Sequence, residues 1–124
     1  MQNCNSKFKT DLTKRCYRFS LEVITLTDKL PNKRSAWVIS DQIIRSATSI
    51  GANIVEAKAA SSRLEFKKFY EISLKSANET KYWLSLLADA ELVNRDIVNS
   101  LLSEVSEIAN MLAAGVLKLK SRKF

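Results

Sequence analysis

Hydrophobic residues recur at spacings of three and four along most of the chain, and this pattern predicts α-helices. Four helical segments are expected, covering about residues 8–30, 36–60, 63–90 and 95–121. The apolar stripe of the first segment contains Leu12, Cys16, Phe19, Val23, Leu26 and Leu30. Because the spacing alternates between four and three, this stripe is typical of a helix that packs nearly parallel to its neighbours.

The other three segments have stripes of the same kind. The stripe of the second segment contains Ile39, Ile43, Ala47, Ile50 and Ile54. One face of the third segment contains Phe66, Phe69, Ser73, Ala77, Thr80, Leu84 and Leu87. The stripe of the fourth segment contains Ile97, Leu101, Val105, Ile108, Leu112 and Leu119, with Gly115 between the last two. Each segment therefore has one face suited to a shared core.

Local signals set the expected ends of these helices. Pro31 ends the first helix, because its ring and its missing N–H cannot continue the hydrogen-bond ladder. Ser62 and Glu65 form a capping-box pattern at the start of the third helix, and Asn94 can cap the fourth. Two glycines and one proline in 124 residues predict long helices and short connections. We therefore expect a single all-α domain, an up-down antiparallel four-helix bundle.

The centre of the second segment, RSATSIGANIVEA, is crowded with small side chains. Small residues allow two helix axes to approach closely, with larger aliphatic residues packing above and below the contact. Asn53 and Glu56 lie near the edge of this face, and each needs hydrogen-bond partners if it is buried. A ligand or catalytic site would account for this pair, but a polar pair that fixes helix register or a subunit contact is the favoured interpretation.

The third segment is apolar on more than one side. Leu64, Tyr82 and Leu86 project well away from its main stripe. A helix that is apolar on several sides is typically buried on several sides, and this indicates self-association. The alternative is that these residues are scattered surface apolar side chains of the ordinary kind.

The net charge is +7, and the cations are clustered. Lys7, Lys9, Lys14 and Arg15 lie near the N-terminus. We expect nucleic-acid binding by a second set, which lies on the third segment and at the C-terminus: Arg63, Lys67, Lys68, Lys75, Lys118, Lys120, Arg122 and Lys123. In an up-down bundle both termini lie at the same end, so their charges add. An ordinary solvated face is the alternative interpretation.

Catalytic and metal-binding patterns are not found in the sequence. The chain has no histidine, which excludes Ser-His-Asp and Cys-His catalysis and the Glu-x-x-His motifs of di-iron bundles. Cys4 and Cys16 match no metal or redox spacing, and both suit a reducing cytoplasm. No apolar run reaches the length of a membrane span. We therefore expect a cytoplasmic protein that is not an enzyme and uses no cofactor or metal.

Two blocks in the middle of the chain carry a family resemblance. IIRSATSIGANIVEA, followed by SRLEFKKFYEISLKSANE, resembles the four-helix-bundle family encoded in intervening sequences of bacterial 23S ribosomal RNA genes. The matching residues are Arg45, Ser46, Ala47, Ser49, Ile50, Asn53, Ile54, Glu56, Phe66, Phe69, Ser76, Ala77, Asn78 and Glu79. The chain departs from the family pattern at Ala57, where the family usually has Gly, and it lacks an Arg that often follows.

The resemblance implies a four-helix protomer that often assembles as a ring-like homopentamer. It also implies kinship with the basic accessory protein of diversity-generating retroelements, which works with a reverse transcriptase. The leading hypothesis is a non-enzymatic protein that binds nucleic acid, with RNA favoured, through its basic surface. The alternative is a protein-interaction scaffold or accessory subunit, for example for a reverse transcriptase.

Overall fold

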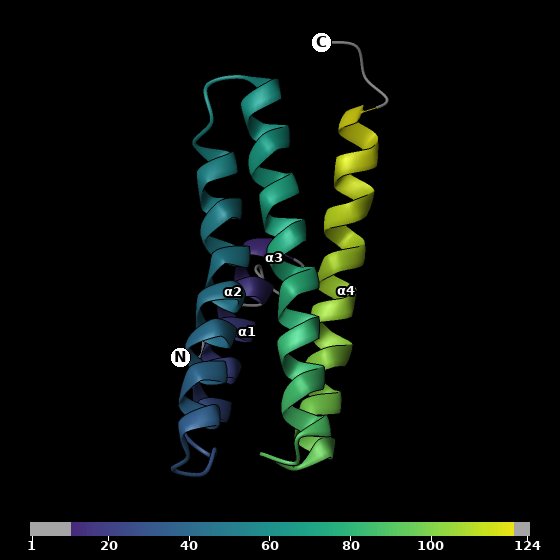
Figure 1. Ribbon diagram of the computed structural model, residues 1–124. Helices are drawn as coiled ribbons and strands as arrows, with labels where there is room; N and C mark the ends of the chain where they lie inside the picture. The colour runs from purple at the N-terminus through teal and green to yellow at the C-terminus, as the bar shows by residue number, and fades with distance from the viewer. Residues whose placement is uncertain (1–10, 121–124) are drawn as a thin grey trace.

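The computed structural model describes residues 11–120, which form four helices joined by short loops (Figure 1). The helices are α1 (Leu12–Thr27), α2 (Arg34–Lys58), α3 (Arg63–Asp89) and α4 (Arg95–Lys120). Consecutive helices run antiparallel, and α1 packs on both α2 and α4. The predicted all-α, up-down four-helix bundle is therefore confirmed, with α1 and α3 on one diagonal.

The ends of α1 differ from the sequence-based expectation. The helix begins at Leu12, and the Asp11 side chain caps it by accepting a hydrogen bond from the Thr13 N–H (2.9 Å). The predicted first residues, 8–10, lie outside the described part of the chain. The helix ends at Thr27 rather than Leu30, because the N–H groups of Lys29 and Leu30 bond only three residues back, in a tighter turn that leads into Pro31.

Polar caps begin α3 and α4. The Ser62 hydroxyl accepts a hydrogen bond from the Glu65 N–H (3.1 Å), as the capping-box pattern predicts. The Glu65 carboxylate in turn accepts from a free N–H group, that of Ser61 (2.8 Å), one residue before the cap. Asn94 caps α4 as expected, accepting from the Asp96 N–H (2.7 Å).

The core follows the predicted stripes, most closely in the middle of the bundle. The largest fully buried side chains are Phe19, Leu26, Ile43, Ile50, Ile54, Leu84, Leu87, Ile108 and Leu112. Stripe residues near the helix ends are only half-buried, among them Phe66, Ile97 and Leu119. α1 is the shortest helix and does not reach the top of the bundle in Figure 1. Described residues of α1 therefore leave the start of α3 and the end of α4 uncovered.

Small hydroxyl residues lie where α2 meets α3. The Ser73 hydroxyl donates to the backbone carbonyl of Ile50 across this contact (2.8 Å). The Thr80 hydroxyl lies 2.9 Å from that of Ser46, and the Ser49 and Ser76 hydroxyls share a hydrogen bond of the same length. A side chain as short as serine reaches the neighbouring backbone only when the helices are close. The small residues of RSATSIGANIVEA therefore allow the tight α2–α3 contact that the sequence predicts.

Helix α4 is the one helix in the described residues that is long and apolar enough to cross a membrane by length and composition. Its apolar stripe is buried against the other helices, with Val105, Ile108 and Leu112 fully covered. Glu104 and Glu107 on the same helix form ion pairs with Arg15 of α1. Packing in the bundle core therefore accounts for the hydropathy of α4.

Candidate nucleic-acid-binding surface

Five of the predicted binding residues gather at one end of the bundle. Arg63, Lys67 and Lys68 lie in the first two turns of α3, and Lys118 and Lys120 lie in the last turn of α4. Both regions are at the top of Figure 1. A groove between them is lined by residues of both helices, which shows that they are neighbours in space. We call these five residues the basic end.

The members of the basic end differ in how far their side chains are exposed. Arg63, Lys68, Lys118 and Lys120 are exposed to solvent. Lys67 is different, because its side chain is only 19% exposed and its Nζ lies 3.4 Å from Glu71 Oε2, one turn along the same helix. Lys118 and Lys120 also complement the negative end of the α4 dipole. Four exposed cations therefore provide most of the positive surface at this end.

The other predicted binding residues are not part of this group. Lys75 is exposed, but it lies twelve residues from Arg63, or about 18 Å along the axis of α3. Arg122 and Lys123 lie outside the described residues, as do Lys7 and Lys9. Their nucleic-acid-binding role stays a prediction.

Arg15, expected in the N-terminal basic cluster, has a structural contact instead. Its guanidinium forms ion pairs with Glu104 (2.7 Å) and Glu107 (2.8 Å), which link α1 to α4. These hydrogen bonds raise the pKa of Arg15 above its ordinary value. Lys58, at the end of α2, lies 3.7 Å from Asp11 in a similar contact with the start of α1. Both cations therefore serve first to hold α1 in place.

Asn53 and Glu56 are placed differently from one another. The Asn53 amide donates to the Ser49 carbonyl (2.8 Å) and hydroxyl (2.9 Å), both on its own helix. It reaches α3 only indirectly, through the hydrogen bond between Ser49 and Ser76. Glu56 is exposed on the protomer. A role for either residue in a subunit interface stays a prediction.

A polar cluster on the outer side of α2 and α3 was not predicted. Arg45 forms an ion pair with Glu79 and also donates to Gln42 (2.8 Å). The Trp83 indole N–H donates to the same Glu79 carboxylate (2.8 Å), and the Tyr82 ring meets the Trp83 ring edge-on at 5.0 Å. Arg45 and Glu79 are both among the residues that carry the family resemblance. That shared membership is the one signal in the sequence that could have paired them.

We predict that this cluster responds to acid. The hydrogen bond from Trp83, and then the contact with Arg45, lower the pKa of Glu79 below its ordinary value of 4.5. The charged Glu79 carboxylate therefore holds Arg45 and Trp83 above pH 4.5. These contacts weaken when Glu79 is protonated, as the pH falls through its lowered pKa. In a Trp37→Phe background, where Trp83 is the remaining tryptophan, its fluorescence should titrate with a midpoint below 4.5. A midpoint at or above 4.5 would contradict the arrangement.

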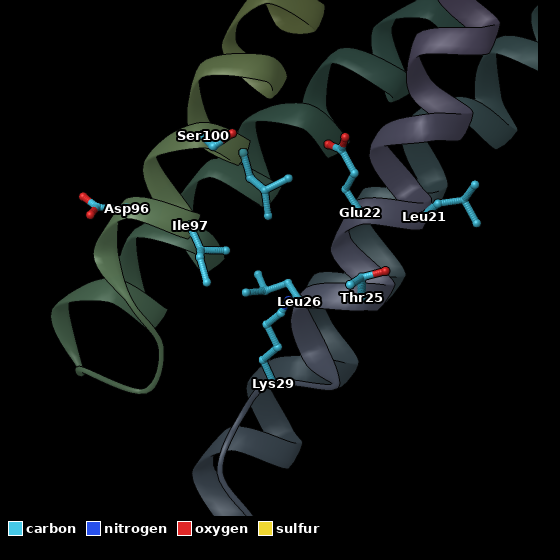
Figure 2. A pocket seen from close by; sticks show the side chains of 9 residues that line it. Leu21, Glu22, Thr25, Leu26, Lys29, Asp96, Ile97 and Ser100 are labelled. Carbon is cyan, nitrogen blue, oxygen red and sulfur yellow. The ribbon is translucent and has the colours of Figure 1, made fainter. Parts of the chain in front are cut away.

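A groove of about 530 Å³ lies between α1 and α4, away from the basic end (Figure 2). Leu26 and Ile97 point toward each other across it, and the Glu22 carboxylate points into the gap. Burial raises the pKa of Glu22. Within residues 11–120, no group of three or more histidine, cysteine or carboxylate side chains could hold a metal ion. None of the predicted binding residues lines this groove.

Cys16 lies in the core with no exposed surface. Burial raises the pKa of its thiol to about 12. The thiol is therefore protonated at neutral pH, and it packs as a small hydrophobic side chain, as its place on the apolar stripe predicts.

The fold and the charged end define a small, basic four-helix-bundle protein. Its sequence matches the family model of the 23S rRNA-intervening sequence protein over residues 9–114, so the chain belongs to this family and the resemblance is confirmed. Among solved structures, it is similar to a protein of unknown function from the S23 ribosomal protein family of Bacteroides thetaiotaomicron. The two are 39% identical with a TM-score of 0.80, over 85% of this chain and 97% of that one. The search of curated proteins found no match.

Proposed function

We propose that this protein is a non-enzymatic nucleic-acid-binding protein that favours RNA. The observation that carries the proposal is the basic end, where exposed cations of α3 and α4 face solvent together. The N-terminus of α3 adds the positive end of a helix dipole to the same region. Membership of a family named for 23S rRNA intervening sequences supports RNA over DNA.

Binding of this kind is electrostatic. Lysine and arginine side chains that contact phosphates release counterions, so the affinity falls as the salt concentration rises. Phosphate contacts carry no base sequence information, and we therefore expect weak sequence preference.

The direct test is binding of the purified protein to a structured RNA and to a DNA duplex across a salt series. We expect the RNA affinity to fall by at least tenfold between 50 and 200 mM salt, as it does when several phosphates are neutralised. Stronger binding to RNA than to DNA would support the favoured ligand. Absence of binding to both nucleic acids at low salt would contradict the proposal.

We further propose that the protein self-associates. Tyr82 and Leu86 of α3 are exposed one turn apart. Leu64 is also exposed on this side of the helix, about 27 Å away along its axis. A second apolar face lies over α1 and α2, where Tyr17, Ile24 and other residues surround a groove of about 400 Å³. Exposed apolar patches of this kind are typical of protein interaction sites.

The two apolar faces favour a ring. They lie on different sides of the protomer, because α1 and α3 are on a diagonal. Contact between two different faces is head-to-tail, and head-to-tail contacts generate closed rings when the rotation closes. The family resemblance implies five subunits. In such a ring the basic end repeats with every subunit, which makes the positive surface multivalent.

The same apolar faces also support the alternative, a scaffold or accessory subunit for a protein partner such as a reverse transcriptase. A scaffold would bind that partner tightly and would be indifferent to bare RNA. The salt series therefore separates the two functions.

A further inference from the structure

The basic end contains a groove whose lining is mostly aromatic and aliphatic. The groove has a volume of about 220 Å³ and lies between the start of α3 and the end of α4. Its lining residues are Phe66, Tyr70, Gly115, Lys118 and Leu119. Aromatic, aliphatic and cationic side chains therefore meet in one small space at the surface of the protein.

The two aromatic rings form a stacked pair. The centroids of Phe66 and Tyr70 are 5.0 Å apart, and their planes are inclined by 22°. Both side chains are half-buried, and they lie at the end of the bundle that the described residues of α1 do not reach. Flat rings held in this way can accept a third flat ring by stacking.

Gly115 is the residue that allows this position of Tyr70. A Cβ atom at Gly115 would lie 2.8 Å from Cε2 of Tyr70, which is closer than such contacts occur. The glycine therefore lets the edge of the tyrosine ring approach α4 closely. Glycine inside a helix costs up to about 1 kcal/mol relative to alanine, so its presence in α4 is accounted for by the ring that it accommodates.

The charge around the groove is positive. Lys118 lines the groove directly, and Lys120 is exposed two residues further along α4. Lys68 lies in a separate groove on the other side of α3. The two carboxylates in the first turns of α3 are engaged, because Glu65 accepts hydrogen bonds from Ser61 and Glu71 pairs with Lys67. A ligand with a flat apolar ring and an adjoining anion fits this arrangement.

We propose that this groove binds one unpaired nucleobase of a single-stranded RNA segment. The base stacks on the Phe66–Tyr70 pair, and a flanking phosphate lies beside Lys118. This inference rests on the proposed nucleic-acid binding and names the form of the ligand. Bases inside a duplex are already stacked on their neighbours, so the groove selects loops, ends and single strands.

The test compares a single-stranded RNA decamer with a blunt RNA duplex of the same sequence. Phe66→Leu keeps an apolar side chain but removes the ring, and Gly115→Ala pushes the Tyr70 ring out of its position. We expect both variants to bind the single strand about tenfold more weakly and the duplex unchanged. Phe69→Leu is the matched control, since Phe69 lies on the same helix and does not line the groove. Circular dichroism verifies that each variant is folded.

A second readout reports stacking itself. A decamer that contains 2-aminopurine should lose fluorescence when it binds the wild-type protein, and Phe66→Leu should restore that fluorescence. If the wild type binds single strand and duplex equally and no variant changes either affinity, the proposal that this groove binds a base is wrong. Salt-dependent nucleic-acid binding would still stand in that case. If the wild type binds neither RNA at low salt, both proposals fall.

Discussion

Replacement of Ala47 by leucine should lower the free energy of unfolding by about 1–3 kcal/mol, the usual cost of adding methylene groups to a packed core. Ala47 is fully buried in the middle of α2. The Ser20 hydroxyl of α1 reaches its backbone carbonyl at 3.4 Å, so neighbouring chain is close on that side. Leucine adds three carbon atoms at this fully buried position, so neighbouring side chains or helices must shift to accommodate them. Chemical denaturation at a fixed protomer concentration measures the change.

The matched control for this prediction is Ala114→Leu. Ala114 is exposed on α4, and leucine and alanine have similar helix propensities, so the stability should stay within about 0.5 kcal/mol of the wild type. Equal effects of the two substitutions would show that the small residues of α2 are not needed for close packing.

If the protein self-associates as proposed, Tyr82→Glu should convert the oligomer into monomers. Tyr82 is 62% exposed on the protomer, its ring contacts Trp83, and exposed Leu86 lies one turn further along the helix. Removing an interface aromatic of this kind costs about 2 kcal/mol or more per contact, which corresponds to roughly a 30-fold loss of affinity at each interface. Burying a carboxylate there adds a desolvation cost. Analytical ultracentrifugation at micromolar concentration measures the mass.

Asn99→Glu serves as the control for assembly, because Asn99 is exposed on α4 and the substitution changes the charge equally. It should leave the mass of the assembly unchanged, and both variants should retain their helical content. A wild-type protein that sediments as a monomer, or a Tyr82→Glu variant of unchanged mass, would contradict the proposed interface.

The sequence predicts most of the fold because the helices are specified locally. The three-and-four spacing identified all four stripes, and the caps at Ser62 and Asn94 are found as expected. The errors are at helix ends: α1 ends three residues before its predicted end, and α2 begins and ends two residues before its predicted bounds. The last residue of α1 is Thr27 and not Leu30. The Glu65 carboxylate accepts its hydrogen bond from the Ser61 N–H.

The candidate site was less predictable, because its contacts join residues far apart in the chain. In the sequence, Arg15 is one of several cations near the N-terminus. Its ion pairs with Glu104 and Glu107 form only because the fold places α4 beside α1. The ion pair of Arg45 with Glu79 depends in the same way on the rotation of α2 against α3. Periodicity gives the face of one helix, but it does not say which residue of the next helix lies opposite.

The central claim is that the basic end binds RNA, and charge reversal at that end tests it most directly. We would compare Lys68→Glu/Lys118→Glu/Lys120→Glu with Lys29→Glu/Lys33→Glu/Arg34→Glu, which changes the net charge equally at the opposite end of the bundle. The first variant should bind RNA about 100-fold more weakly at 100 mM salt, with the slope of log affinity against log salt reduced by about three. The second variant should bind nearly as the wild type does. Equal losses in both variants, or no loss in either, would contradict a binding surface at the basic end.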